Sequence, residues 1–183
     1  MKPRLSLNDS WDLLDRDDSD ERMPRNPDGS PKLPTKPPQA GTPGFGSIEM
    51  YKNGWEDGDM SNLTVPRCFF ARSLLERVSF LNTELTESWL CWDNFEGCDF
   101  WKSVLTRCDM RCSYWKNCRF DKADLTGADL RGSNFENCTL EGATFKDTLV
   151  LPGDVLLAQL SEAQKAGIVL KRQGGQPHDG CIY

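Results

Sequence analysis

Large apolar residues recur at every fifth position through the middle of the chain. Counted from Cys68 to Pro152, seventeen consecutive blocks of five residues have Phe, Leu, Met, Trp or Val at their third position, without one insertion. The first position of most blocks is Ala, Ser, Thr or Cys, and the other three are mixed and largely polar. Helices repeat every 3.6 residues and strands every two, so neither element fits this spacing. The pattern is instead typical of a repeat architecture.

The small first position of the block accounts for most of the cysteines. A reduced cysteine behaves as a small hydrophobe, which suits a tight interior site. The chain has no paired CxxC motif, and its single histidine, His178, lies near the C-terminus. We therefore favour packing over disulfides or metal binding, and expect no metal, no cofactor and a reducing cytoplasmic location. Five of the eight cysteines are at this position: Cys68, Cys98, Cys108, Cys118 and Cys138.

The blocks ADLTG and ADLRG, residues 123–132, resemble those of the pentapeptide repeat family, and the resemblance covers 85 of 183 residues. It implies an all-β fold, a right-handed quadrilateral β-helix in which four blocks form one square coil and the first and third residues point inward. Residues 20 apart would then stack at about 4.8 Å, in about four to five coils. One interior edge would hold Phe80, Phe100 and Phe120 beside Cys98, Cys118 and Cys138, and the next would hold Leu85, Leu105 and Leu125.

Two residues depart from the family pattern. Asp93 occupies a small inward position, where a carboxylate is costly unless backbone N–H groups bond it, and Trp115 brings a large indole to the third position. Each could mark a local bulge. As a catalytic acid, Asp93 lacks a partner base or nucleophile at suitable spacing.

The repeat divides the chain into segments. Residues 1–47 contain eight of the eleven prolines and a mixed charge run, which predicts an extended or disordered tail. Residues 48–67 form either an N-terminal cap or the first rungs, and residues 68–152 form the β-helix. Residues 153–172 are a C-terminal cap with a short helix near Leu160–Gly167 and room for one further rung, and residues 173–183 are a flexible tail.

The composition weighs against nucleic acid and membrane partners. The net charge of -6 and the pI near 4.9 do not provide the clustered Lys and Arg that phosphate binding needs. There is no secretory signal and no apolar stretch long enough to span a membrane.

Catalytic motifs are missing, so the chain is expected to be a non-enzymatic protein-binding solenoid. The repeat contains no histidine for a triad, no phosphate loop and neither GxSxG nor HExxH. Aromatic residues favour interfaces because they bury a large area. The candidate binding residues are the outward Phe69, Trp89, Trp92, Trp101 and Tyr114, with Trp11 in a helical turn of the tail that is either transient or a docking segment. Alternatively, residues 48–65 fold back and cover these aromatic residues.

Two functions remain open. The leading one is an immunity or antitoxin-type protein that neutralises a partner, a toxin or another enzyme. The alternative, implied by the family resemblance, is a DNA mimic that protects or inhibits gyrase, a type II topoisomerase. Residues 107–147 contain seven acids and seven bases, which makes a poor imitation of a polyanion. A homodimer through a capped end of the rod also stays open.

Overall fold

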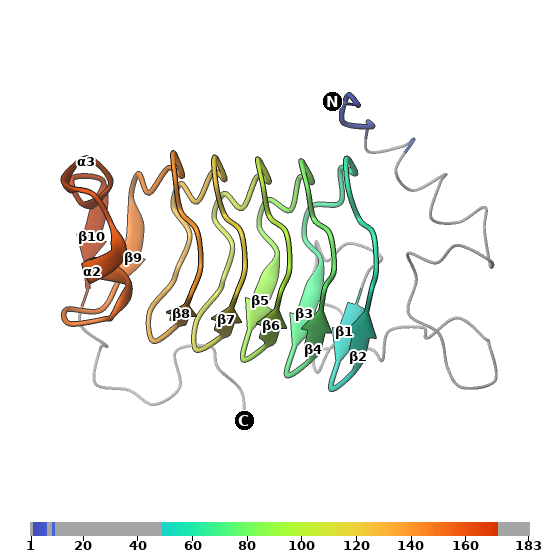
Figure 1. The fold of residues 1–183 in the computed structure, drawn as a ribbon, viewed down its shortest axis with the longest axis horizontal. Helices are drawn as coiled ribbons and strands as arrows, with labels where there is room; N and C mark the ends of the chain where they lie inside the picture. Colours follow the sequence, from blue (N-terminus) through green and yellow to red (C-terminus); the bar gives the residue numbers. More distant parts are fainter. Residues whose placement is uncertain (1, 7–8, 10–48, 172–183) are drawn as a thin grey trace.

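The computed structural model describes residues 2–6, 9 and 49–171, of which residues 49–170 form a β-solenoid of about six turns (Figure 1). The quadrilateral β-helix expected from the repeat is confirmed. It has more turns than the four to five expected, because it begins at Glu49 and completes a last turn through two short helices. The strands are β1 (Glu49–Tyr51), β2 (Gly54–Glu56), β3 (Phe69–Ala71), β4 (Leu74–Glu76), β5 (Trp89–Cys91), β6 (Asn94–Glu96), β7 (Tyr114–Lys116), β8 (Asn134–Glu136), β9 (Thr148–Val150) and β10 (Ile168–Leu170), and the helices are α2 (Leu156–Gln159) and α3 (Glu162–Lys165).

Four parallel ladders, one on each side of the coil, join residues that are 20 apart. One side is the sheet β1-β3-β5, and another is β2-β4-β6-β7-β8. Single bridges continue the first side and form the two others, as in Asp59–Ser79–Asp99 and Thr64–Glu84–Val104. The β9 strand pairs with β10 in the same register. Each side therefore takes five residues, and successive coils stack without a shift.

The third-position side chains fill the interior in stacks. Phe80, Phe100 and Phe120 lie face to face, with ring centroids 4.7 and 4.9 Å apart and planes within 7°. The predicted leucine stack, from Leu85 to Leu125, is completely buried. A fully buried side chain of this size contributes about 1.5–3 kcal/mol, so these stacks dominate the stability of the solenoid.

Neither Asp93 nor Trp115 interrupts the register, so the expectation of local bulges was wrong. Trp115 is completely buried and stacks between Phe95 and Phe135, with centroid distances of 4.1 and 5.9 Å. The β7 strand that carries it pairs in register with β6 and β8. A planar indole fits because its neighbours 20 residues away are also planar rings.

The small first-position residues are hydrogen-bond donors as well as packing residues. The Ser113 hydroxyl donates to the Leu90 carbonyl of the preceding coil at 2.6 Å, and the thiol of Cys108 donates to the Leu85 carbonyl at 3.0 Å. Burial raises the pKa of Cys108 to about 12, so this thiol stays protonated at neutral pH. The seven cysteines in the described part of the chain are free thiols.

Residues 49–65 form coils and do not fold back over outward aromatic residues. Met50, Trp55, Met60 and Val65 continue the third-position series and are buried. The indole of Trp55 occupies the space beside Gly58, where an added Cβ would lie 2.1 Å from its ring. A glycine at this first position therefore compensates for the large third-position residue of the preceding block.

Two glutamines close the C-terminal end of the β-helix. The side-chain amide of Gln159 donates to the Phe135 carbonyl, and that of Gln164 donates to the Leu140 carbonyl, each at 2.8 Å. These amides replace the donors that a further coil would supply. Gln164 also completes a capping box with Ser161 at the start of α3. The same side chain therefore caps the helix and supplies a hydrogen-bond donor to the last full coil.

Asp93 is a buried carboxyl in a file of small inward residues. It is 1% exposed, its Oδ1 accepts the Ser73 N–H at 2.7 Å, and Oδ2 has no hydrogen-bond partner. Burial raises the pKa of Asp93 well above its ordinary value, and the Ser73 N–H opposes this shift. The neutral form is favoured, because a buried carboxylate loses its hydration and this one has a hydrogen bond at only one of its oxygens. The other members of this file are Asn53, Ser73, Ser113 and Ser133.

We expect the substitution Asp93→Asn to increase the free energy of unfolding more at high pH than at low pH. The raised pKa means that above about pH 4 the folded protein binds more protons than the unfolded chain. The wild type therefore loses up to about 1.4 kcal/mol per pH unit between the unfolded-state pKa and the folded-state pKa. Asparagine keeps the acceptor for Ser73 and does not ionise. Urea titrations from about pH 5 to about pH 8 measure the difference, and a difference that does not change with pH would contradict the assignment.

Removing the glutamine cap should destabilise the C-terminal turn. We expect Gln164→Ala to lower the free energy of unfolding by about 1–2 kcal/mol, because it leaves the Leu140 carbonyl without this donor and removes the capping box. Gln164→Glu should lose less, since a carboxylate still accepts the Ser161 N–H of the capping box but cannot donate to the Leu140 carbonyl. The exposed neighbouring substitution Glu162→Gln is the control for urea unfolding. Equal stability of all three variants would show that the amide does not contribute.

Candidate protein-binding surface

The register places Phe69 and Trp89 at the same outward position of β3 and β5. Their rings are 5.7 Å apart and inclined by 37°. Phe69 is only 2% exposed, whereas Trp89 is partly exposed. Phe69, predicted as a binding residue, therefore supports Trp89 and does not itself form accessible surface.

The corner after β5 carries the most exposed aromatic side chain in the described part of the chain. Trp92 is at the fifth position of its block, with φ at 62°, and is 44% exposed. Leu74, the first residue of β4, is 43% exposed and pairs with Asn94, two residues after Trp92. Tyr114 pairs with Asn94 from the other side. We call this surface the Trp92 corner: Leu74, Trp89, Trp92, Asn94 and Tyr114.

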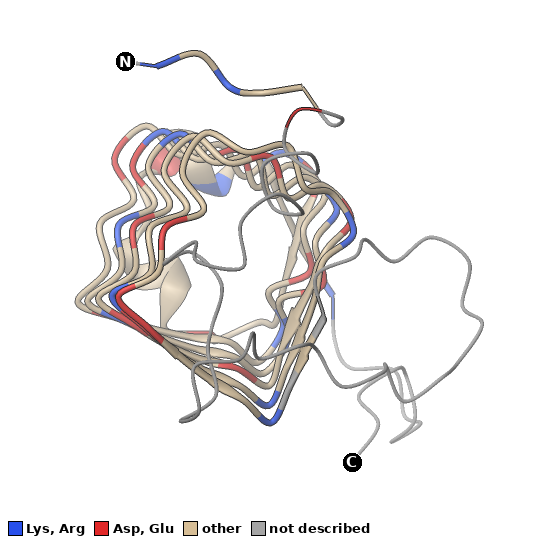
Figure 2. Ribbon diagram, turned by 90° about the vertical axis from the view of Figure 1, so that its right-hand side faces the viewer, with Lys and Arg blue, Asp and Glu red and all other residues tan. Residues whose placement is uncertain are grey.

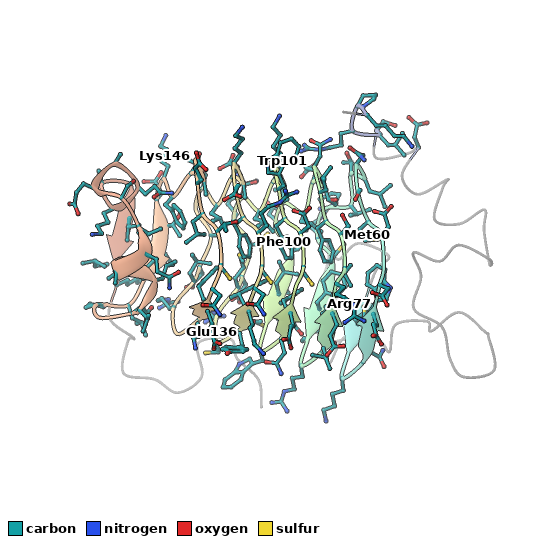
Figure 3. All side chains as sticks on the ribbon, in the orientation of Figure 1. Met60, Arg77, Phe100, Trp101, Glu136 and Lys146 are labelled. Atoms are coloured by element: carbon teal, nitrogen blue, oxygen red, sulfur yellow. The ribbon has the colours of Figure 1, made fainter. Side chains whose placement is uncertain are left out.

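Trp101 lies on a different edge. In Figure 3 it is at the upper edge of the solenoid, whereas Arg77 and Glu136 are at the lower edge. The hydroxyl of Tyr114 donates to Glu136, so Tyr114 belongs to the lower edge. The Trp101 ring is instead surrounded by cations, with the Lys102 ammonium 4.5 Å and the Arg119 guanidinium 5.7 Å from its centroid. The predicted site residues thus divide between two edges. Trp11 lies outside the described residues.

Charged side chains on the coil surface are paired between neighbouring coils. Figure 2 shows acidic and basic segments beside one another in successive coils. Residues 20 apart form several of the ion pairs, such as Arg107–Glu87 and Arg119–Asp99. Such pairs at exposed positions add little stability, but they neutralise the charge locally. Ion pairs with this spacing include Arg77–Asp57, Arg107–Glu87, Lys116–Glu96 and Arg119–Asp99.

A less accessible charge network lies beyond Trp89 on the same side of the coil. The outward Asp109 and Asp129 continue the position of Trp89, and Arg111 and Arg131 lie beside them. These four side chains are 12–17% exposed. The guanidinium of Arg131 donates twice to Asp129, at 2.8 and 2.6 Å. Charge is thus matched along this side as well.

Sequence reasoning missed two contributors to the surface. Leu74 has an outward position that the five-residue period alone does not single out, and only the 20-residue register pairs it with Asn94, two residues after Trp92. Residues 2–6 were assigned to the tail by composition, yet Arg4 and Leu5 hydrogen-bond to the solenoid.

Within residues 2–6, 9 and 49–171, no group of His, Cys, Asp and Glu is arranged to hold a metal. In the same residues, no helix is long and apolar enough to cross a membrane.

Comparison with known proteins identifies the repeat. The family model described as pentapeptide repeat region matches residues 68–145. No curated protein sequence matches. Among solved structures, Rfr23, a pentapeptide repeat protein from the cyanobacterium Cyanothece 51142, is 24% identical with a TM-score of 0.41, over 52% of this chain and 62% of that one. A pentapeptide repeat protein from the Arabidopsis thaliana thylakoid lumen is 22% identical with a TM-score of 0.37, over 63% of this chain and 74% of that one.

A third structure is full-length QnrB1, a plasmid-mediated fluoroquinolone resistance protein. It is 16% identical with a TM-score of 0.39, over 54% of this chain and 58% of that one. The chain thus spans less than two thirds of the length of Rfr23 and of QnrB1. The unbroken five-residue period, the four-sided coils and the family model that matches residues 68–145 together show that this part of the chain is a pentapeptide repeat region.

Proposed function

We propose that this chain is a non-enzymatic protein-binding solenoid that uses the Trp92 corner to bind a protein partner. Solenoids of this family are generally non-enzymatic. The observation that carries the proposal is the exposure of two large apolar side chains on adjacent coils of the repetitive scaffold: Trp92 is 44% exposed, and Leu74, which pairs with Asn94, is 43% exposed. Exposed aromatic and aliphatic side chains that are fixed in place bury a large area on binding with little loss of conformational freedom.

The most specific form of this proposal is an immunity or antitoxin-type protein that blocks a toxin or another enzyme in the cytoplasm. A rod whose coils stack in register offers a fixed surface, so it can occlude a partner's site without rearranging. Tyr114 and Asn94 add polar groups beside the apolar ones, which suits the mixed composition of interfaces that form between folded proteins.

The alternative function, a gyrase-directed DNA mimic, is less consistent with the surface charge. A mimic needs a continuous negative potential, and this chain has 28 acids against 22 Lys and Arg. Pairs such as Arg119–Asp99 and Lys116–Glu96 cancel much of the remaining field from coil to coil. The charge distribution therefore favours a partner that recognises apolar contacts.

Removing the exposed indole should reduce partner recovery strongly without unfolding the solenoid. We expect Trp92→Asn to reduce recovery of the partner from native lysate by about tenfold or more, the effect of losing one interface hot spot. Asparagine tolerates the positive φ of this corner, as it does at Asn62 and Asn82, so the fold should persist. The recovered protein is identified by mass spectrometry, and its affinity is then measured with purified components.

The matched control is Trp101→Ala, which removes an indole from the other edge. Recovery by this variant should equal that of the wild type. A Trp92→Asn variant that retains full affinity would exclude the Trp92 corner, and equal losses in both variants would show that neither edge is specific.

The charge balance predicts that the purified chain does not relieve quinolone inhibition of gyrase. In a DNA supercoiling assay with gyrase, quinolone and increasing protein, we expect activity equal to that with an inert protein at the same concentration. Dose-dependent recovery of supercoiling would contradict this and would favour the DNA-mimic function. Recovery that persists in Trp92→Asn would place that activity outside the Trp92 corner.

A further inference from the structure

The extended residues 2–6 lie against a corner of the first coils, far along the chain from their own position. The Leu5 N–H donates to the Asn62 carbonyl at 2.8 Å, and the Thr64 hydroxyl donates to the Leu5 carbonyl at 2.6 Å. The Leu5 side chain packs against the edge of the hydrophobic core. The backbone of Leu5 is therefore held from both sides, much as an added strand would be.

Arg4 extends this contact to the next two coils. Its Nε donates to the Asn82 carbonyl at 2.8 Å, and its Nη2 lies 3.3 Å from Asn82 Oδ1 and 3.4 Å from the Lys102 carbonyl. The planar guanidinium presents these donors in a fixed fork, which a lysine cannot reproduce. Asn82 is only 8% exposed, so the contact is largely shielded from water.

The repeat itself creates these acceptors. Asn62, Asn82 and Lys102 are fifth-position residues 20 apart, with φ between 55° and 63°. The N–H of each belongs to the ladder, where it donates to the Leu81, Trp101 or Asp121 carbonyl of the following coil. Their own carbonyls receive the donors of Arg4 and Leu5.

The asparagine side chains orient the acceptor for Arg4. The Nδ2 of Asn82 donates to Asn62 Oδ1 at 3.0 Å, which leaves Asn82 Oδ1 directed to the guanidinium. The negative charge of Glu84 also interacts with Arg4 and opposes the effect of burial, which lowers the pKa of Arg4. The acceptor atoms of Asn82 and the negative charge of Glu84 together favour a cation with several hydrogen-bond donors.

We call this corner the arm site: Asn62, Thr64, Asn82 and Lys102. We propose that it binds an extended segment of a protein partner in which an arginine precedes an aliphatic residue. Residues 4–5 occupy the arm site until the partner displaces them. The contacts go to backbone carbonyls and short side chains, so they recognise this donor pattern and not a longer sequence. The arm site lies on the Trp101 edge, apart from the Trp92 corner, so the proposal stands independently of the proposed function.

Because residues 4–5 already occupy the arm site, a partner segment must compete with them to bind. An intramolecular segment competes at an effective concentration of the order of millimolar. A segment with the same chemistry binds measurably only when it is more complementary than residues 4–5, or when those residues are removed. The arm therefore makes the arm site selective for partners that bind tightly.

A labelled peptide with the sequence MKPRLSLND, residues 1–9, tests the site directly. The full chain with Arg4→Ala and Leu5→Ser has lost the groups that occupy the site, and fluorescence anisotropy should show that it binds the peptide. The wild-type chain should bind about tenfold more weakly or not at all, because its own arm competes. The peptide with Arg4→Ala should lose about tenfold or more, the effect of losing hydrogen bonds from a charged donor, and the Arg4→Lys peptide should also bind more weakly.

The outcomes separate the alternatives. No binding to the double variant, or equal binding to both chains, would overturn the arm site as a peptide site. Circular dichroism confirms that the double variant is folded, and the single Arg4→Ala chain replaces it if it is not. A wild-type dimer in light scattering that dissociates in the Arg4→Ala chain would instead assign the occupant to a second copy, and would overturn the assignment to a partner.

Discussion

The structure depends on one constraint, the unbroken 20-residue register between parallel coils. In-register pairing places each side chain on another from the same block position, at about 4.8 Å, which suits stacked planar rings such as Phe80 and Phe100. The same spacing brings each first-position hydroxyl or thiol to a carbonyl of the preceding coil, as Ser113 reaches Leu90. The same register therefore determines both the packing of the core and the hydrogen bonds of the buried polar groups, and neither can change without the other.

The interior could be predicted from sequence because it follows a single period. The predictions that were wrong concerned residues considered without their neighbours 20 positions away. Trp115 looked too large for its block, but its neighbours 20 residues away, Phe95 and Phe135, make a column of rings. Asp93 looked too polar, but Ser73 directs an N–H to it. The start of the solenoid was left open for the same reason, since Gly58 makes sense only beside the indole of Trp55.

The surface could be predicted only in part, because a five-residue period shows which way a side chain faces and not what surrounds it. Phe69 and Trp92 are both outward aromatic residues, yet they are 2% and 44% exposed. The arm residues Arg4 and Leu5 have no period at all, and proline and charge dominate the segment that contains them. Arg4 and Leu5 bind to backbone carbonyls at the corners of the coil. The direction of these carbonyls is set by a positive φ, which many residue types adopt here, including Asn82 and Lys102.

The register also limits how this solenoid can recognise a partner. Acidic and basic side chains 20 residues apart meet across adjacent coils, as in Arg77–Asp57 and Arg107–Glu87, and their fields cancel within a Debye length of about 10 Å. Long-range steering is therefore weak, and specificity must come from short-range contacts. An exposed indole such as Trp92 provides one kind of short-range contact and a file of corner carbonyls provides the other. Both involve fifth-position residues with a positive φ, where the chain turns: Trp92 presents its side chain there, and Asn82 and Lys102 present their carbonyls.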